Sequence, residues 1–267
     1  MRRTKMTDHT PQLHRYALGH GTVAFSTTRH GGHGTGRYAS FNINPYCGDA
    51  DEAIAANRHD LCRLLDIDES HLVMPHQTHG IESRIIGSEF LSLPAAVRTM
   101  ILDGVDAVMT QQTGLCIGVS TADCIPLLIH DESHHAVCAV HAGWRGTVAS
   151  IALKAVHDMR AAFGSQPADL HVVIGPGISR ECFEVGDEVY EAFAQAGFNM
   201  EAISERRDKW HIDLPLCNKL TLEAAGVPSD HITMSGICTY TSSGDFFSAR
   251  HDGAESGRIY NGIMLTQ

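Results

Sequence analysis

The stretch Ser120-Thr-Ala-Asp-Cys124-Ile-Pro-Leu-Leu128, followed by Ala139-Val-His141-Ala-Gly-Trp144, decides the fold and the candidate chemistry of this chain. A cysteine ends one apolar run and a histidine ends the next, and Pro126 and Gly143 then interrupt regular structure. Neighbouring strands that end in a thiol and an imidazole can build a metal site or a nucleophile–base pair.

A third candidate, His79, lies upstream in Met74-Pro-His-Gln-Thr-His79-Gly80, just after a short apolar run. If His79, Cys124 and His141 converge, three protein ligands leave a fourth tetrahedral position for water, which is typical of catalytic zinc. Such an ion lowers the pKa of its bound water to about 7. Each residue also has a structural interpretation: a buried thiol, an imidazole bonded to a backbone carbonyl, and a surface turn around His76 and His79. Spacing alone leaves both interpretations open.

The composition is that of an ordinary globular protein, with 267 residues of which 43% are hydrophobic and 19% charged. The net charge of −11 argues against nucleic acid as a partner, because neutralising phosphates takes a basic surface. Small anionic or neutral substrates need only a local cationic pocket. We expect no membrane span, because no apolar run is long enough, and no signal peptide, because the basic start lacks an apolar segment.

Eight cysteines are scattered without a regular framework, and Cys116, Cys138 and Cys238 lie inside apolar runs. A chain of this length builds its own core and needs no disulfide staples, so free buried thiols are the favoured interpretation. Thiols stay reduced in the cytoplasm, which is therefore the predicted location.

Strand-like and helix-like patterns are mixed along the chain. Strands are expected over residues 22–26, 71–74, 82–86, 107–110, 115–120, 126–129, 136–141, 170–174, 231–240 and 259–265. Helices are expected over residues 50–65, 147–163, 186–196 and 214–225, the last with Asp213 as N-cap. Because helices and strands do not alternate regularly, we expect an α+β fold with mixed sheets in a sandwich. It should form one domain over residues 19–267, after a flexible segment over residues 1–18.

Three further motifs have simpler interpretations. His130-Asp-Glu132 fits the H-x-E fragment of zinc deaminases, but the companion P-C-x-x-C is missing, so residues 131–135 are expected to form a hairpin turn. The glycine-rich Arg29-His-Gly-Gly-His-Gly-Thr-Gly36 fits no nucleotide-binding motif and is expected to be a mobile loop, with an active-site lid as one function. Gly175-Pro-Gly177-Ile-Ser179 either offers backbone N–H groups to an anion or is a tight turn.

Taken together, the motifs resemble those of one known family. In chain order they are Ser26-Thr-Thr-Arg29-His-Gly-Gly32, Ser40-Phe-Asn42, Gln77-Thr-His79, Asp106-Ala-Val-Met-Thr110, Thr121-Ala-Asp-Cys124, Val140-His-Ala-Gly-Trp-Arg-Gly146, Ile174-Gly-Pro-Gly-Ile178, Cys182-Phe-Glu-Val-Gly186 and Cys238-Thr-Tyr240, then Phe246-Phe-Ser-Ala-Arg250. Over roughly residues 20 to 265 the chain resembles the YfiH family, also called the laccase-domain or multicopper polyphenol oxidase-like family.

The resemblance implies a YfiH-like catalytic domain in which helices flank the sandwich. It implies a purine nucleoside phosphorylase activity on adenosine and inosine, with adenosine deaminase and methylthioadenosine phosphorylase activities beside it. The implied partners are small molecules, a nucleoside and phosphate. The implied cofactor is zinc, with copper able to occupy the site in vitro, held by two histidines and a cysteine that match His79, Cys124 and His141.

Further roles follow as hypotheses. His79, Cys124 and His141 are expected to be catalytic as well as metal ligands, with Asp123 moving protons beside them. The expected substrate-binding residues are Arg29, Asn42, Gln77, Arg145 and Arg250, whose arginines would hold phosphate.

Three other functions stay open. Two histidines and a cysteine are also a blue-copper ligand set, which suggests a polyphenol oxidase, yet none of the 18 histidines forms the H-x-H pair expected of a multicopper oxidase. A metal-free cysteine hydrolase, such as an amidase that edits peptidoglycan precursors, would use Cys124 as nucleophile and His141 as base. A non-catalytic metabolite-binding or scaffold protein is the third.

Overall fold

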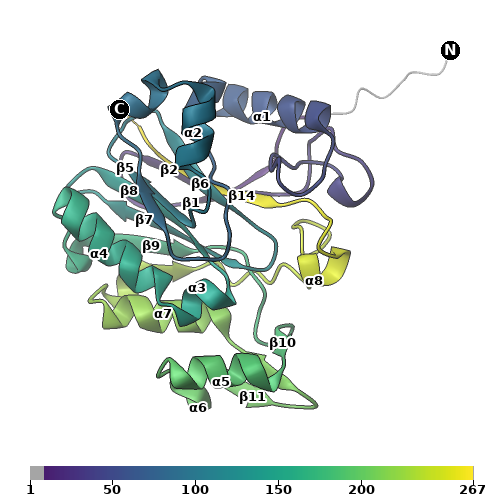
Figure 1. Cartoon of the computed structure of the whole chain (residues 1–267), viewed down its shortest axis with the longest axis vertical. Coiled ribbons are helices and arrows are strands. Elements are labelled where there is room, and N and C mark those ends of the chain that lie inside the picture. Colours follow the sequence, from purple (N-terminus) through teal and green to yellow (C-terminus); the bar gives the residue numbers. More distant parts are fainter. Residues whose placement is uncertain (1–8, 267) are drawn as a thin grey trace.

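The computed structural model describes residues 9–266 and contains two mixed β-sheets packed against each other, with helices outside both (Figure 1). The first sheet has the order β1 (Leu13–Tyr16), β2 (Thr22–Thr27), β14 (Ile259–Leu265), β6 (Cys116–Thr121) and β3 (Leu72–Val73). The second has the order β13 (Ile232–Met234), β9 (Leu170–Ile174), β7 (Ile125–Asp131), β8 (Ala136–Ala142), β5 (Ala107–Thr110) and β4 (Ser83–Ile85). The predicted α+β sandwich is confirmed.

Eight α-helices lie within residues 9–266. They are α1 (Asp51–Leu65), α2 (Ala95–Ile101), α3 (Trp144–Val148), α4 (Ile151–Phe163), α5 (Asp187–Gln195), α6 (Met200–Ile203), α7 (Leu214–Ala224) and α8 (Ala249–Asp252). Short 3-10 turns occur at Gly36–Tyr38, Glu69–His71, Ser88–Ser92, Pro167–Asp169 and Ser229–His231. Among these helices none has the length and apolarity needed to cross a membrane.

The central strands are buried on both faces, which explains their unbroken apolar sequences. Every residue of β6, β7, β8 and β14 is buried. In β8 the side chains alternate: Val140 faces the helical layer, whereas Ala139 belongs to the core between the sheets. Strands covered on both sides need apolar residues at every position, so they lose the alternation of a one-sided sheet.

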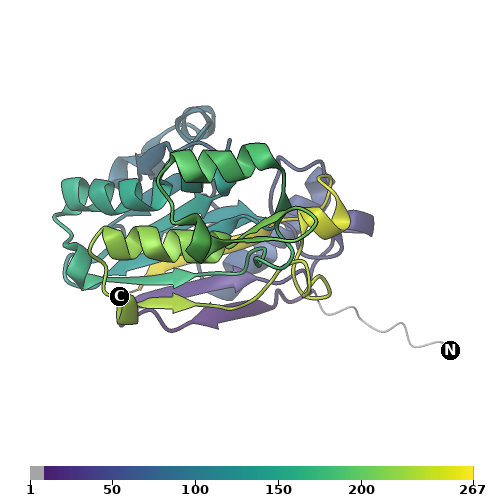
Figure 2. The same cartoon turned by 90° about the horizontal axis from the view of Figure 1, so that it is seen from below.

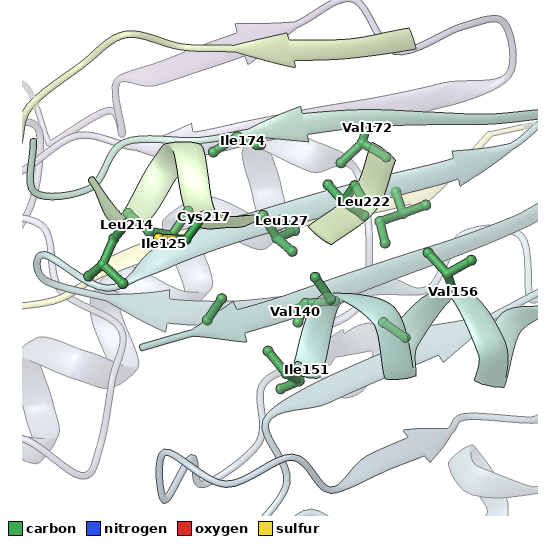
Figure 3. Close-up of a cluster of buried hydrophobic side chains, with 14 of the residues drawn as sticks. Ile125, Leu127, Val140, Ile151, Val156, Val172, Ile174, Leu214, Cys217 and Leu222 are labelled. Atoms are coloured by element: carbon green, nitrogen blue, oxygen red, sulfur yellow. The ribbon is translucent and has the colours of Figure 1, made fainter. Parts of the chain in front are cut away.

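Helices α4 and α7 cover the outer face of the six-stranded sheet, as Figures 1 and 2 show. Figure 3 shows Leu127 and Val140 of the sheet beneath Ile151 and Val156 of α4 and Leu222 of α7. Full burial of each such side chain contributes about 1.5–3 kcal/mol to stability. On the opposite side α1 packs against the five-stranded sheet.

A small third sheet lies apart from the sandwich beside α5 and α6 (Figure 1). Its order is β10 (Glu184–Val185), β12 (Trp210–Ile212) and β11 (Ser204–Arg206). Its strands have two or three residues each, which is too short for a periodic sequence pattern, and none was expected there.

Most predicted elements are confirmed, including the strands at 107–110, 170–174 and 259–265 and the N-cap Asp213, which accepts a hydrogen bond from the backbone N–H of Leu216. The helix predicted over 147–163 is two helices, because Ser150 adopts a left-handed conformation with φ 60° and ends α3. The strand predicted over 231–240 is wrong beyond Met234, since Gly236 has φ 68° and turns the chain.

The flexible segment predicted over residues 1–18 is wrong for residues 13–16, which form β1 and pair antiparallel with β2. This edge strand, Leu-His-Arg-Tyr, has two exposed polar residues at its centre, so no apolar pattern marks it. The part of the prediction over residues 1–8 lies outside the described residues.

Candidate metal centre

The three residues singled out from the sequence meet at one end of the sandwich, where the chain crosses between the two sheets. His79 follows β3 of the five-stranded sheet, and Cys124 lies in the connection from β6 to β7, which belong to different sheets. His141 is the penultimate residue of β8. The site is therefore assembled from both halves of the fold.

The ligand atoms of His79, Cys124 and His141 all lie within 4.8 Å of one another. The two imidazoles meet edge to face, with ring centroids 4.8 Å apart. Gly143 makes this convergence possible: a Cβ there would lie 3.0 Å from Cδ2 of His79 and 3.1 Å from Sγ of Cys124. Two imidazole nitrogens and a thiolate sulfur are the donor set of catalytic zinc sites, so these residues fit a divalent metal ion.

Asp106 orients His141 from beneath. Its Oδ1 accepts a hydrogen bond of 2.7 Å from Nδ1 of His141, and both groups are buried. The same carboxylate accepts backbone N–H groups of Thr78, His79 and Gly80 at 2.8–3.3 Å. With Nδ1 committed to Asp106, Nε2 of His141 would be the nitrogen that binds a metal ion, as in histidines whose tautomer is fixed by a carboxylate behind them. One carboxylate thus positions two of the three ligands.

Charge stabilises the ionised forms at this site. Burial disfavours the Cys124 thiolate, but the charge and hydrogen bonds of His141 and then His79 outweigh it and lower the pKa of Cys124 to about 6. Burial likewise opposes protonation of His141, but the Cys124 charge and then Asp106 raise the pKa of His141 to about 9. Burial also disfavours the Asp106 carboxylate, yet its bonds to His141 and the backbone lower the pKa of Asp106. A metal-free thiolate–imidazolium pair is the result.

The triad opens into a cavity of about 370 Å³, within the size range of small-molecule sites. Its lining within the described chain is polar and carries no carboxylate: Asn44, Tyr46, Cys47, His76, Gln77, His79, Ser120, Thr121, Ala122, Cys124, His141, Ala249, Ala254 and Arg258. A second cavity of about 310 Å³ lies between α1 and α2 and contains none of the three candidate ligands.

Aromatic and amide groups shape the wall of the cavity beside His79. The rings of His76 and Tyr46 are tilted by 32° with centroids 4.3 Å apart, and Nδ1 of His76 hydrogen-bonds Asp103 at 2.7 Å. Gln77, predicted to bind substrate, does line the cavity. Both ends of its amide are bonded to the backbone of Ser120, at 2.9 and 2.7 Å, so its first effect is to hold that strand end in place.

Asp123 was predicted to move protons, and the structure places its carboxylate in a hydrogen-bond network with the 239–250 segment. It does not line the cavity, and its carboxylate accepts hydrogen bonds from the hydroxyls of Thr239 (2.7 Å) and Ser248 (2.6 Å) and the backbone N–H of Arg250 (2.7 Å). Its φ of 90° turns the side chain away from its neighbour Cys124 and toward the 239–250 segment. Asp123 is an anchor for that segment.

The three arginines predicted to hold phosphate do not line the cavity either. Arg29 bonds the carbonyls of Ala39 and Ser243 and pairs with Asp252, and Arg250 bonds the carbonyls of Cys182 and Glu184. Arg145 lies exposed over the ring of Trp144. None of the three arginines therefore borders the cavity.

Asn42 is buried and does not reach the cavity, although it was predicted to bind substrate. Its Nδ2 donates to Asp49 and its Oδ1 accepts the backbone N–H groups of Asn44 and Arg258. Asn42 therefore positions two residues that do line the cavity. The sequence prediction missed both, although Arg258 carries one visible signal, a lone arginine between a glycine and the last strand.

The two remaining loops have structural roles. In the glycine-rich loop, Gly32 and Gly34 are bonded to Ser40, and none of its residues lines the cavity, so a lid function has no support in this geometry. The backbone N–H groups of Gly175 and Gly177 bond the carbonyls of Pro126 and Ile237, which leaves no nest for an anion. The chain bends at Pro176, and Gly177 pairs with Cys238 in an isolated bridge, so the segment has a structural role.

Residues 23–266 match the profile of a family described as multi-copper polyphenol oxidoreductase laccase. A purine nucleoside phosphorylase of Bacteroides thetaiotaomicron is 46% identical over 244 residues, which cover 90% of each chain. A protein named adenosine deaminase RL5, from an unknown prokaryotic organism, is 42% identical over 91% of this chain and 94% of its own. The crystal structure of Bacillus licheniformis hypothetical protein YfiH has a TM-score of 0.85, with 29% identity over 92% of this chain and 93% of that one.

Proposed function

The chain belongs to the multi-copper polyphenol oxidoreductase laccase family, the YfiH-like proteins, and from this premise we propose that it is a purine nucleoside phosphorylase. Its substrates are adenosine and inosine, with adenosine deaminase and methylthioadenosine phosphorylase activities beside them. The observation that carries the proposal is that relatives named for two reactions of purine nucleosides are each more than 40% identical over nearly the whole chain.

The cavity suits a nucleoside. The tilted rings of Tyr46 and His76 offer an aromatic surface for a purine, and polar side chains of the lining can meet ribose hydroxyls. A cavity of about 370 Å³ holds a ligand of that size without rearrangement.

We infer that the ion held by His79, Cys124 and His141 is zinc. A thiolate with two imidazoles suits zinc, and copper can occupy the same set in vitro. When bound, zinc supplies a Lewis acid that lowers the pKa of water to about 7. The surrounding residues have their own tasks: Asp106 holds the His141 tautomer and Gly143 leaves room for the ligands to meet.

We propose His76, which lines the cavity, as the proton carrier in place of Asp123. Its Nδ1 is bonded to Asp103, which leaves Nε2 as the ring nitrogen for proton transfer. An imidazole oriented by a carboxylate is the commonest general acid–base group in enzymes. It would deliver a proton to the purine as the base leaves in phosphorolysis, or to the leaving amine in deamination.

The test is a product analysis with the purified protein. Bound metal is measured first, and adenosine is then incubated with and without inorganic phosphate and followed by chromatography. We expect adenine and ribose 1-phosphate with phosphate, and inosine without it. Cys124→Ala should lose the metal and both activities, and full activity in that variant would refute the assignment.

A metal-free cysteine hydrolase, such as an amidase that edits peptidoglycan precursors, is the second candidate because one observation favours it. Asp106, His141 and Cys124 form a continuous relay, with a lowered thiol pKa at its end, which is the geometry of a nucleophile–base–orienter triad. Inhibitors distinguish the phosphorylase from the cysteine hydrolase. Inactivation by a chelator supports the phosphorylase, and inactivation by thiol alkylation with indifference to chelators supports the hydrolase.

A polyphenol oxidase has less support. Among the described residues one cluster of three potential ligands is present, whereas a multicopper enzyme needs several copper sites close together. An intense blue colour on adding copper, with turnover of phenols, would favour the oxidase. We also propose a cytoplasmic location, because all eight cysteines are free.

A further inference from the structure

We propose that Arg258 is the residue that binds inorganic phosphate in the metal-centre cavity. The inference rests on the proposed phosphorylase function and adds the location of its second substrate. Phosphorolysis needs a dianion held next to the anomeric carbon of the ribose. A phosphate oxygen forms a bond to C1′ while the C1′–N9 bond breaks, and the proton that phosphate gives up goes to the departing purine. A cation on the cavity wall is therefore required.

Arg258 is the one lysine or arginine among the described residues that line the cavity. The three arginines that the sequence suggested for this task are bound elsewhere or exposed outside it. The wall also carries no aspartate or glutamate within residues 9–266, so an anion that enters meets the guanidinium without a competing carboxylate on that wall. The positive charge of Arg258 and its position on the cavity wall both suit phosphate.

The partners of Arg258 leave its charge uncompensated. Its Nη1 donates to the carbonyls of Ser256 and Gly257 and to the Ser256 hydroxyl, and its Nη2 donates to the carbonyl of Ala254. All these acceptors are neutral, in contrast to Arg29, which pairs with a carboxylate. Carbonyl acceptors fix the plane of a guanidinium without neutralising its charge. The charged group can therefore still bind a phosphate oxygen.

Neighbouring groups hold the residue in place. The backbone N–H of Arg258 donates to Oδ1 of buried Asn42, and the residue directly precedes β14 at the centre of the five-stranded sheet. The positive charge reaches the thiol of Cys47, another residue of the cavity wall, where it counteracts the effect of burial on the pKa of Cys47. A half-buried cation held in place by its backbone, on the wall of the same cavity as the candidate metal ligands, is a preorganised anion site.

The test uses the metal-loaded, full-length protein and compares Arg258→Gln and Arg258→Lys with the wild type. The matched control is Arg63→Gln, which removes the same charge from an exposed position on α1. We expect Arg258→Gln to raise the KM for phosphate about 10- to 100-fold, the effect of losing a charged hydrogen-bonding partner, and Arg258→Lys to raise it less. Deamination of adenosine without phosphate should stay near the wild-type rate in both, and Arg63→Gln should match the wild type throughout.

The outcomes separate this inference from the function on which it rests. If the wild type phosphorolyses nucleosides but Arg258→Gln keeps the wild-type KM for phosphate, Arg258 is not the phosphate ligand. If phosphorolysis and deamination fall together while metal content is unchanged, Arg258 supports the nucleoside or the fold, and the inference is again wrong. If the wild type has neither activity, it is the proposed function that fails.

Discussion

Asp106 and His141 are joined twice, through the 2.7 Å bond between Oδ1 and Nδ1 and through the backbone, where the N–H of His141 donates to the carbonyl of Asp106 at 2.8 Å. The imidazole therefore has neither rotational freedom nor a choice of tautomer. The same carboxylate accepts hydrogen bonds from the backbone of residues 78–80. A substitution at Asp106 should therefore displace His79 as well as His141.

Asp106→Asn should weaken metal binding about 10- to 100-fold, since groups behind a ligating histidine commonly contribute that much to affinity. An amide cannot accept both from the imidazole and from three backbone N–H groups. Competition with a chromogenic chelator measures the affinity. Asp103→Asn, which alters the carboxylate behind His76, serves as control and should retain the metal. Equal affinity for both variants would contradict the role given to Asp106.

Gly143→Ala should lower metal occupancy although alanine is small. Its Cβ would lie 3.0 Å from His79 and 3.1 Å from the sulfur of Cys124, closer than ordinary contacts allow, so the ligands must separate. Elemental analysis after dialysis reports the occupancy. Gly244→Ala is a matched control, because a Cβ there meets nothing within 4 Å. Full occupancy in Gly143→Ala would show that the three ligands can shift without loss.

In the metal-free protein, Cys124 should react with iodoacetamide down to about pH 6, where its pKa lies. The thiolate is the nucleophile, so the rate holds above pH 6 and falls as acid protonates the sulfur. Peptide mapping distinguishes this thiol from Cys238, whose pKa is lowered to about 7 because bonds from Ser179 and Thr241 outweigh burial. Added zinc should protect Cys124. A midpoint near pH 8.5 would exclude the ion pair with His141.

His76→Gln should lower kcat for deamination about 10²- to 10⁴-fold, the usual contribution of a general acid–base group, with metal content unchanged. The glutamine keeps a polar side chain of similar reach but cannot exchange a proton. Steady-state kinetics and elemental analysis on the same preparation give both values. Unchanged kcat would return the proton-carrying role to another group.

Asp123→Ala should lower the stability of the folded protein. Its carboxylate accepts three hydrogen bonds in a buried setting, so we expect the free energy of unfolding to fall by roughly 3 kcal/mol, with the 239–250 segment loosened. Urea unfolding measures the loss. If stability is unchanged while deamination disappears, the prediction from the sequence was right and Asp123 is catalytic.

The sequence was informative wherever a pattern repeats or a motif is compact. The apolar runs of β7 and β8 predict the sandwich, and the family motifs name His79, Cys124 and His141, which the structure brings together as candidate metal ligands. Asp123 misled because its neighbour Cys124 lies in the site, yet a φ of 90° sends the carboxylate the other way. Local sequence does not encode that reversal.

Arg258 was missed for the opposite reason. It stands far from the ligand motifs in sequence, and it lines the cavity only because β14 pairs with β6 in the middle of the sheet. Arg29, Arg145 and Arg250 lie in recognisable motifs but do not border the cavity. Which arginine faces a cavity depends on strand pairing, which a single sequence does not reveal.

Because His79 and Cys124 lie in connections between the two sheets and His141 lies at the end of β8, a bound ion would act as a crosslink at that end of the sandwich. Metal depletion should then abolish the activity and also increase the unfolding rate, because the sheets would separate more easily at the end where the ion joins them. The lifetime of the protein would become shorter. A cell short of that metal would then lose the protein by turnover, and restoring the metal to old protein would recover less activity than supplying it during synthesis.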